Sequence, residues 1–165
     1  MAISQAVSLY NYVQRLQGAA GESVIQLELQ VSYIIPPAGD YVMVGLAPPR
    51  YLSVVPSQTG VGLGLLDPGD NVTITGHSLG GHLAAIGQRL FPDLFDTTVT
   101  FNAPGFDPLV GVTTFPGSSI GFVSLGEQRT DEFVNTLFSP YLDTPPLTNF
   151  GNIEVMVSED SVPYQ

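Results

Sequence analysis

The decisive stretch of the sequence for its chemistry is Val72-Thr73-Ile74-Thr75-Gly76-His77-Ser78-Leu79-Gly80-Gly81-His82-Leu83-Ala84-Ala85. Its first four residues are β-branched and predict a strand, while the small and apolar residues after Gly80 predict a helix. Between them lies a Gly-x-Ser-x-Gly pattern, which is typical of a sharp turn from a strand into a helix. The stretch therefore predicts a strand, a turn centred on Ser78 and a helix in direct succession.

The turn suits Ser78 to a role as a nucleophile. A serine hydroxyl reacts poorly unless it stands clear of its neighbours, with a base and an oxyanion site nearby. Gly76 and Gly80 lack side chains that would collide at so tight a crossing, and Gly81 lets the helix begin close to the sheet. The backbone N–H of Leu79, at the start of the helix, is expected to donate a hydrogen bond to an oxyanion.

The composition limits the class of protein. The chain has 165 residues, 44% hydrophobic and 12% charged, which predicts one globular domain over residues 1–165. A net charge of -11 argues against nucleic acid or an anionic membrane as a partner. The absence of cysteine excludes disulfides, thiol catalysis and thiolate metal sites, and we expect no metal. No apolar stretch is long enough to span a membrane, and no signal peptide is visible at the start of the chain.

Residues before the decisive stretch predict a helix and two strands. Apolar residues recur at helical spacing over 3–17, and residues 25–35 alternate between apolar and polar side chains as in a half-buried strand. A turn at 36–40 leads to a second strand over 41–46. Residues 47–70 are rich in proline and glycine and predict a loop.

Residues after the turn complete a parallel unit. The helix after Ser78 is expected to end near Phe91, before Pro92, and a strand follows over 97–101. A strand, a helix and a strand in this order predict a βαβ unit, and hence an α/β fold with a mainly parallel sheet and flanking helices. Further along the chain we expect a loop over 102–130, a short helix over 131–139 and a strand over 153–157.

A serine hydrolase also needs an acid that orients its base. Asp160 is the leading candidate, because it follows an apolar strand, and the carboxyl ends of strands line the crevice of an open α/β sheet. Asp107 competes with it from the loop after the second strand of the βαβ unit. Asp131 is expected to be only the N-cap of its helix.

The base is the member that the sequence does not supply. The chain has two histidines, and both lie in the decisive stretch. His77 adjoins the serine and should pack structurally on the opposite side of the strand end. His82 lies one helical turn beyond Ser78, where a histidine usually packs or caps. No histidine follows Asp160.

Taken together, these residues resemble the class 3 lipase-type α/β-hydrolases. The chain is most similar to the lipase-like domains of large bacterial secreted proteins of the calcium-binding repeat-toxin type. The matching segments are Gln5-Ala6-Val7-Ser8-Leu9-Tyr10-Asn11-Tyr12, Gly76-His77-Ser78-Leu79-Gly80-Gly81-His82-Leu83-Ala84, Arg89-Leu90-Phe91-Pro92, Thr100-Phe101-Asn102-Ala103-Pro104-Gly105-Phe106 and Asp160-Ser161-Val162-Pro163. The resemblance implies an α/β-hydrolase-like fold and a secreted, extracellular protein. It also implies that apolar esters or lipids are hydrolysed through an acyl-enzyme without a cofactor, with Asp160 as the acid.

The resemblance also shows what is missing. Such lipases carry an upstream strand that supplies a second oxyanion donor, and a histidine beyond the aspartate; neither is found here. We therefore expect the chain to represent the middle of a longer domain, with a divergent hydrolase or a catalytically silent binding module as alternatives. A missing strand would leave the edge of strand 71–75 open to a second copy of the chain, unless residues 25–46 cover it.

Overall fold

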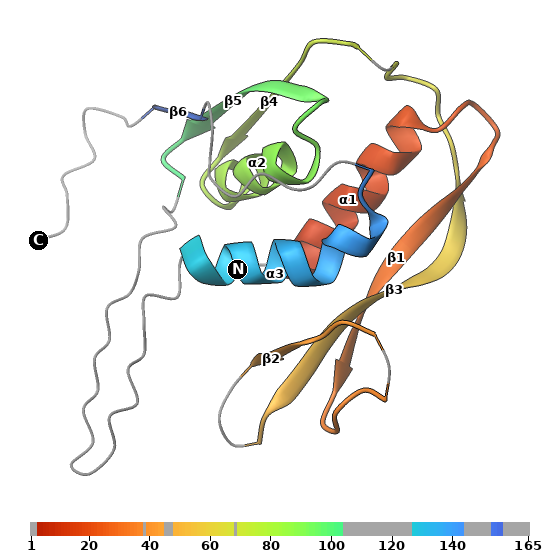
Figure 1. Ribbon diagram of the computed structural model, residues 1–165. Coiled ribbons are helices and arrows are strands. Elements are labelled where there is room, and N and C mark those ends of the chain that lie inside the picture. Colours follow the sequence, from red (N-terminus) through yellow and green to blue (C-terminus); the bar gives the residue numbers. More distant parts are fainter. Residues whose placement is uncertain are drawn as a thin grey trace, which may run out of the picture.

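The computed structural model describes residues 3–37, 39–44, 48–67, 69–103, 127–143 and 153–156, with backbone alone for 127–132 and 153–156. The elements follow in the order α1 (Ile3–Gln17), β1 (Ser23–Ser32), β2 (Val42–Val44), β3 (Arg50–Val61), β4 (Val72–His77), α2 (Leu79–Leu90), β5 (Phe95–Phe101), α3 (Glu127–Phe138), a 3-10 turn (Ser139–Tyr141) and β6 (Ile153–Met156). In Figure 1, β1 and β3 form a long twisted ribbon that extends away from β4, β5 and α2.

The expectation of an α/β-hydrolase-like fold with one mainly parallel sheet is wrong. The described strands form two sheets, an antiparallel one in the order β1-β3-β2 and a parallel one in the order β4-β5-β6. The pairing of β2 with β3 follows from their connection, because residues 45–49 are too few to hold a crossover helix and a short link favours antiparallel pairing. The alternating apolar and polar residues of the antiparallel sheet also suit a sheet with one face in water, as antiparallel sheets commonly have. The chain is thus a small mixed domain.

The loop expected over 47–70 is wrong over most of its length, because β3 occupies 50–61. The loop is expected because the segment is rich in proline and glycine, and one of these residues, Pro56, lies within β3 although proline cannot donate to a ladder of hydrogen bonds. In the structure β2 pairs with β3 over Arg50–Leu52, so Pro56 lies where one side of β3 has no partner among the described strands. The register with β1 also shifts between Ile25 and Leu27, opposite this part of β3. A proline is tolerated at such a place.

The strand expected over 25–35 forms as β1, but it ends at Ser32 and buries little of its apolar face. Leu27 is buried, whereas Ile25 and Val31 are 61% and 52% exposed. The anchor is Asn11 of α1, whose side-chain amide donates to the Leu27 carbonyl at 2.8 Å and whose oxygen accepts from the Leu27 N–H at 2.7 Å. Helix α1 thus covers only the middle of β1.

The elements around the turn agree closely with expectation. Helix α1 has the bounds predicted. Strands β4 and β5, which precede and follow α2 in the sequence, pair in parallel, which confirms the βαβ unit. Strand β6 pairs in parallel with β5 at 153–156. The third helix begins at Glu127, four residues before Asp131. The expectation that Asp131 caps this helix is therefore wrong, and most of the loop expected over 102–130 lies outside the described residues.

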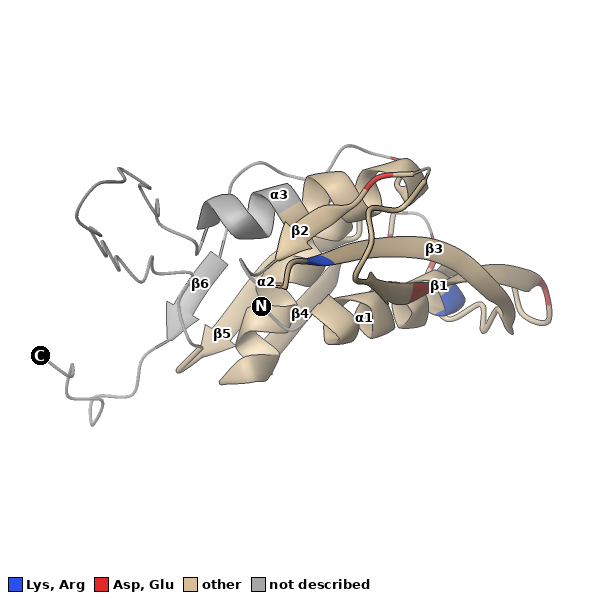
Figure 2. Cartoon of the chain, turned by 90° about the horizontal axis from the view of Figure 1, so that it is seen from below, with Lys and Arg blue, Asp and Glu red and all other residues tan. Residues whose placement is uncertain are grey.

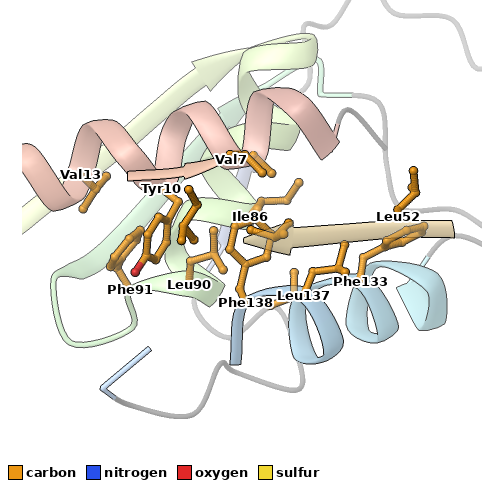
Figure 3. Packing of buried hydrophobic residues seen from close by; sticks show 14 of the residues in the cluster. Val7, Tyr10, Val13, Leu52, Ile86, Leu90, Phe91, Phe133, Leu137 and Phe138 are labelled. Atoms are coloured by element: carbon orange, nitrogen blue, oxygen red, sulfur yellow. The ribbon is translucent and has the colours of Figure 1, made fainter. Parts of the chain in front are cut away.

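The hydrophobic core lies where the three helices meet β2 and β3 (Figure 3). Tyr10 of α1 stacks on Phe91, with ring centroids 5.5 Å apart, and also contacts Phe138 of α3 at 5.7 Å. Ile86 of α2 is fully buried between these helices. The apolar residues that recur at helical spacing in α1 therefore hold the two sheets together.

Tyr10 makes the core sensitive to alkaline pH. Its hydroxyl donates to the carbonyl oxygen of Tyr141 at 2.7 Å, and burial, followed by the charge of Asp143, raises the pKa of Tyr10 to about 12. Because the folded state holds this proton more tightly than the unfolded state, its stabilising effect is complete below pH 10 and is lost as the pH rises to about 12.

Tyr10→Phe is therefore expected to cost about 1 kcal/mol near neutral pH, through the lost hydrogen bond. The difference in the free energy of unfolding between the variant and the wild type should narrow between pH 10 and about 12, because only the wild type loses stability there. Urea unfolding of both proteins across this range measures the difference. A gap that stays constant with pH would contradict the proposed role of Tyr10.

Candidate active site

Ser78 is the single residue between β4 and α2, as predicted. Its backbone conformation is unusual. It has φ 53° and ψ -126°, a positive φ that few residues other than glycine adopt. A conformation of this kind costs about 1–3 kcal/mol and tends to persist at functional sites. The serine is also exposed. The strand-to-helix turn thus holds the serine at the surface in a strained geometry.

Hydrogen bonds to neighbouring elements hold this turn. The Ser78 N–H donates to the carbonyl oxygen of Phe101, the last residue of β5, at 2.9 Å. The Ser78 carbonyl accepts from the N–H groups of Gly81 at 2.9 Å and His82 at 3.3 Å. The turn is therefore tied to the end of the adjacent parallel strand and to the first turn of α2 (Figure 1).

Two of the three glycines have the tight surroundings that the sequence predicts. A methyl group on Gly76 would overlap the carbonyl carbon and oxygen of Gly80 and would lie 2.6 Å from the Gly81 nitrogen. One on Gly81 would lie 2.7 Å from the Cβ of Ala103. Gly80 differs, because a Cβ there would meet nothing within 4 Å. The expectation that a side chain at position 80 would collide with its surroundings is therefore wrong.

The N-terminus of α2 faces the turn with the polarity that an oxyanion requires. Leu79 is the first residue of α2, and an N–H at that position has no acceptor inside the helix. The helix dipole adds partial positive charge at the same end. The Leu79 side chain is 43% exposed, so this end of the helix is open to a ligand from solvent. The geometry is compatible with the donor role expected for Leu79.

Asn102 is a feature that the sequence did not bring out. It follows β5 directly and has φ 45°, so it and Ser78 are the only residues other than glycine with positive φ in the described part of the chain. Since β4 and β5 are parallel neighbours, both residues lie at the carboxyl edge of the same sheet. The signal in the sequence is weak: asparagine tolerates left-handed backbone, but it does so in many ordinary turns.

The remaining candidates divide into two groups. His77 is exposed at the end of β4, so the expectation that it packs structurally is wrong. The Nε2 atom of His82 is buried. Asp160 and its competitor Asp107 lie outside the described residues, so the structure does not place either acid. No group of three or more acidic or histidine side chains that could hold a metal occurs in the part of the chain that the structure describes.

Comparisons with protein-family models, curated proteins and solved structures found no match for this chain. Among the helices that the structure describes, none is long and apolar enough to cross a bilayer.

Proposed function

We propose that this chain is a serine carboxylic-ester hydrolase of the lipase or esterase type, acting through an acyl-enzyme on Ser78. The observation that carries the proposal is the backbone of Ser78, which holds a hydroxyl-bearing side chain at positive φ where glycine would cost less. A strained residue at an exposed strand-to-helix turn has an explanation if its hydroxyl must stand clear to react.

In the proposed reaction the Ser78 oxygen attacks the carbonyl carbon of an ester and loses its proton to a base. The carbonyl oxygen becomes an oxyanion, which the Leu79 N–H and the positive end of α2 stabilise. Collapse of this intermediate breaks the bond to the alcohol, which leaves with a proton, and the acyl group stays on Ser78. Water then attacks the acyl-enzyme, releases the acid and restores the serine. No cofactor takes part in these steps.

The substrate proposed is a neutral, apolar ester or a lipid. Strand β4 and the first turns of α2 carry no Asp, Glu, Lys or Arg, as Figure 2 shows. The whole chain has a net charge of -11, which disfavours anionic substrates and suits an extracellular protein. We include a secreted location and a part in lipid metabolism in the proposal on the strength of the sequence resemblance.

Asp160 is proposed as the acid that orients the base, because the sequence places it just after β6. The base itself is not assigned. His82 follows Ser78 by one helical turn, but its buried Nε2 favours a packing role, while Ser78 is exposed. His77 directly precedes the nucleophile at the end of β4. Because successive side chains of a strand point to opposite faces, its position does not favour contact with the Ser78 hydroxyl.

A catalytically silent binding or assembly module is the second candidate. The observation in its favour is that both histidines of the sequence lie in the segment 77–82, and neither has a geometry that marks it as the base. The strands within residues 25–46, β1 and β2, belong to the other sheet, and among the described strands β4 has a neighbour on one side alone. A second copy of the chain paired along this open edge is the partner that we propose for such a module.

Two measurements on the same protein separate these candidates. An enzyme should react with a fluorophosphonate at one site, and mass spectrometry should find the adduct on Ser78 in the wild type and not in Ser78→Ala. A module should show no adduct, together with a dimer by size-exclusion chromatography with light scattering. Absence of the adduct would remove the esterase proposal, and a monomer at every concentration would remove pairing along β4.

A further inference from the structure

An apolar groove of about 390 Å³ lies between α1, β4 and α2. Leu9 and Leu16 of α1 form one wall, and Ile74 of β4 and Leu83 of α2 contribute to the other side. None of the residues that line it is charged. Its volume falls within the range of about 300–1,000 Å³ that is usual for sites of small ligands, which are mostly apolar.

The groove reaches the turn that carries the nucleophile. Thr75 and Gly80 both line it, three residues before and two residues after Ser78. Two peptide units span at most about 7.6 Å between Cα atoms, so the Gly80 end of the groove lies within reach of a group bonded to Ser78. The space where a Gly80 side chain would stand is empty to 4 Å.

We propose that this groove binds the acyl chain of the ester and selects an aliphatic chain of about eight carbons. This inference rests on the esterase function proposed for Ser78. Leu9 and Leu16 are seven residues apart on α1 and therefore about 10 Å apart along its axis. An extended aliphatic chain advances about 1.3 Å per carbon, given the length of a C–C bond, so about eight carbons fill that distance. The walls of the groove are uncharged and mainly apolar, which matches an aliphatic chain.

The test measures binding in Ser78→Ala, where no hydrolysis can interfere. The neutral fluorophore N-phenyl-1-naphthylamine is bound to the protein and displaced with butanol, hexanol and octanol. Each added methylene buried in the groove should tighten binding about four-fold, up to octanol. Affinities that do not depend on chain length would overturn the inference.

Gly80→Leu adds a side chain at the Gly80 end of the groove, where a Cβ would meet nothing within 4 Å. We expect octanol to bind at least about ten-fold more weakly to Gly80→Leu, since fewer methylenes can be buried. Ser4→Leu is the matched control, because it adds the same side chain to an exposed position of α1 that does not line the groove. Unchanged circular dichroism shows that each variant folds, and equal octanol affinity in Gly80→Leu and Ser4→Leu would overturn the inference.

Failure of this inference and failure of the esterase proposal give different results. If alkanols bind with the expected dependence and no adduct forms at Ser78, the groove stands as an aliphatic site and the esterase function falls. If Ser78 hydrolyses esters at rates that do not depend on acyl length, and octanol does not bind, the esterase function stands and the groove falls.

Discussion

Ser78→Ala is expected to reduce hydrolysis of p-nitrophenyl butyrate by a factor on the order of a thousand or more. The nucleophile of a serine hydrolase acts as one unit with its base, so its removal costs on the order of a thousand-fold or more in kcat. Release of p-nitrophenol, followed by absorbance with equal concentrations of both proteins, measures the loss. Ser8→Ala is the matched control, because Ser8 is an exposed serine of α1 whose hydroxyl donates to the Ser4 carbonyl oxygen.

A second variant checks whether the strain at Ser78 is real. Ser78→Gly removes the hydroxyl and also relieves the positive φ, so it should raise the free energy of unfolding by about 1 kcal/mol, while Ser78→Ala should not. Equal hydrolysis by the wild type and Ser78→Ala would end the claim that Ser78 is a nucleophile. Equal stability of the two variants would remove the argument from strain.

Gly76→Ala is expected to destabilise the fold by about 3 kcal/mol or more, because its methyl group would overlap backbone atoms of Gly80 that cannot rotate away. The start of α2 would have to move away from β4, which would also displace Ser78 and lower any hydrolysis. Urea unfolding followed by circular dichroism measures the change in free energy.

Gly80→Ala supplies the control for this effect at the other glycine of the pattern. It adds the same methyl group to open space near the start of a helix, where alanine is favoured over glycine by up to about 1 kcal/mol. We expect Gly80→Ala to be as stable as the wild type or slightly more stable. An equal loss of unfolding free energy in Gly76→Ala and Gly80→Ala would contradict the claim that the close crossing of β4 and α2 requires glycine at position 76.

The parts of the fold that the sequence predicted well are those with local signals. Apolar residues at helical spacing gave α1 its bounds, and β-branched runs on both sides of a helix gave the parallel pair of β4 and β5. The strand over 50–61 was missed because Pro56 is compatible with a strand only where a partner is absent or the register shifts. Neither condition can be seen from the proline itself.

The candidate site divides in the same way. Ser78 and Leu79 were placed correctly at the turn, because glycine spacing and strand and helix propensity all lie within a short segment. Asn102 was missed, since its left-handed backbone at the end of β5 depends on how that strand is seated beside β4. The proposed acid, Asp160, is named from the sequence alone.

Local periodicity and the absence of side chains at Gly76 and Gly81 act within a few residues, so the sequence is enough to predict a strand, a tight turn with a serine and a helix. The division of the strands into two sheets, and the packing of α1 on α2 that leaves an apolar groove lined by α1, β4 and α2, appear in the tertiary structure alone. Those features depend on pairings between distant segments, whose apolar faces are compatible with more than one partner. Packing of the whole chain selects among them.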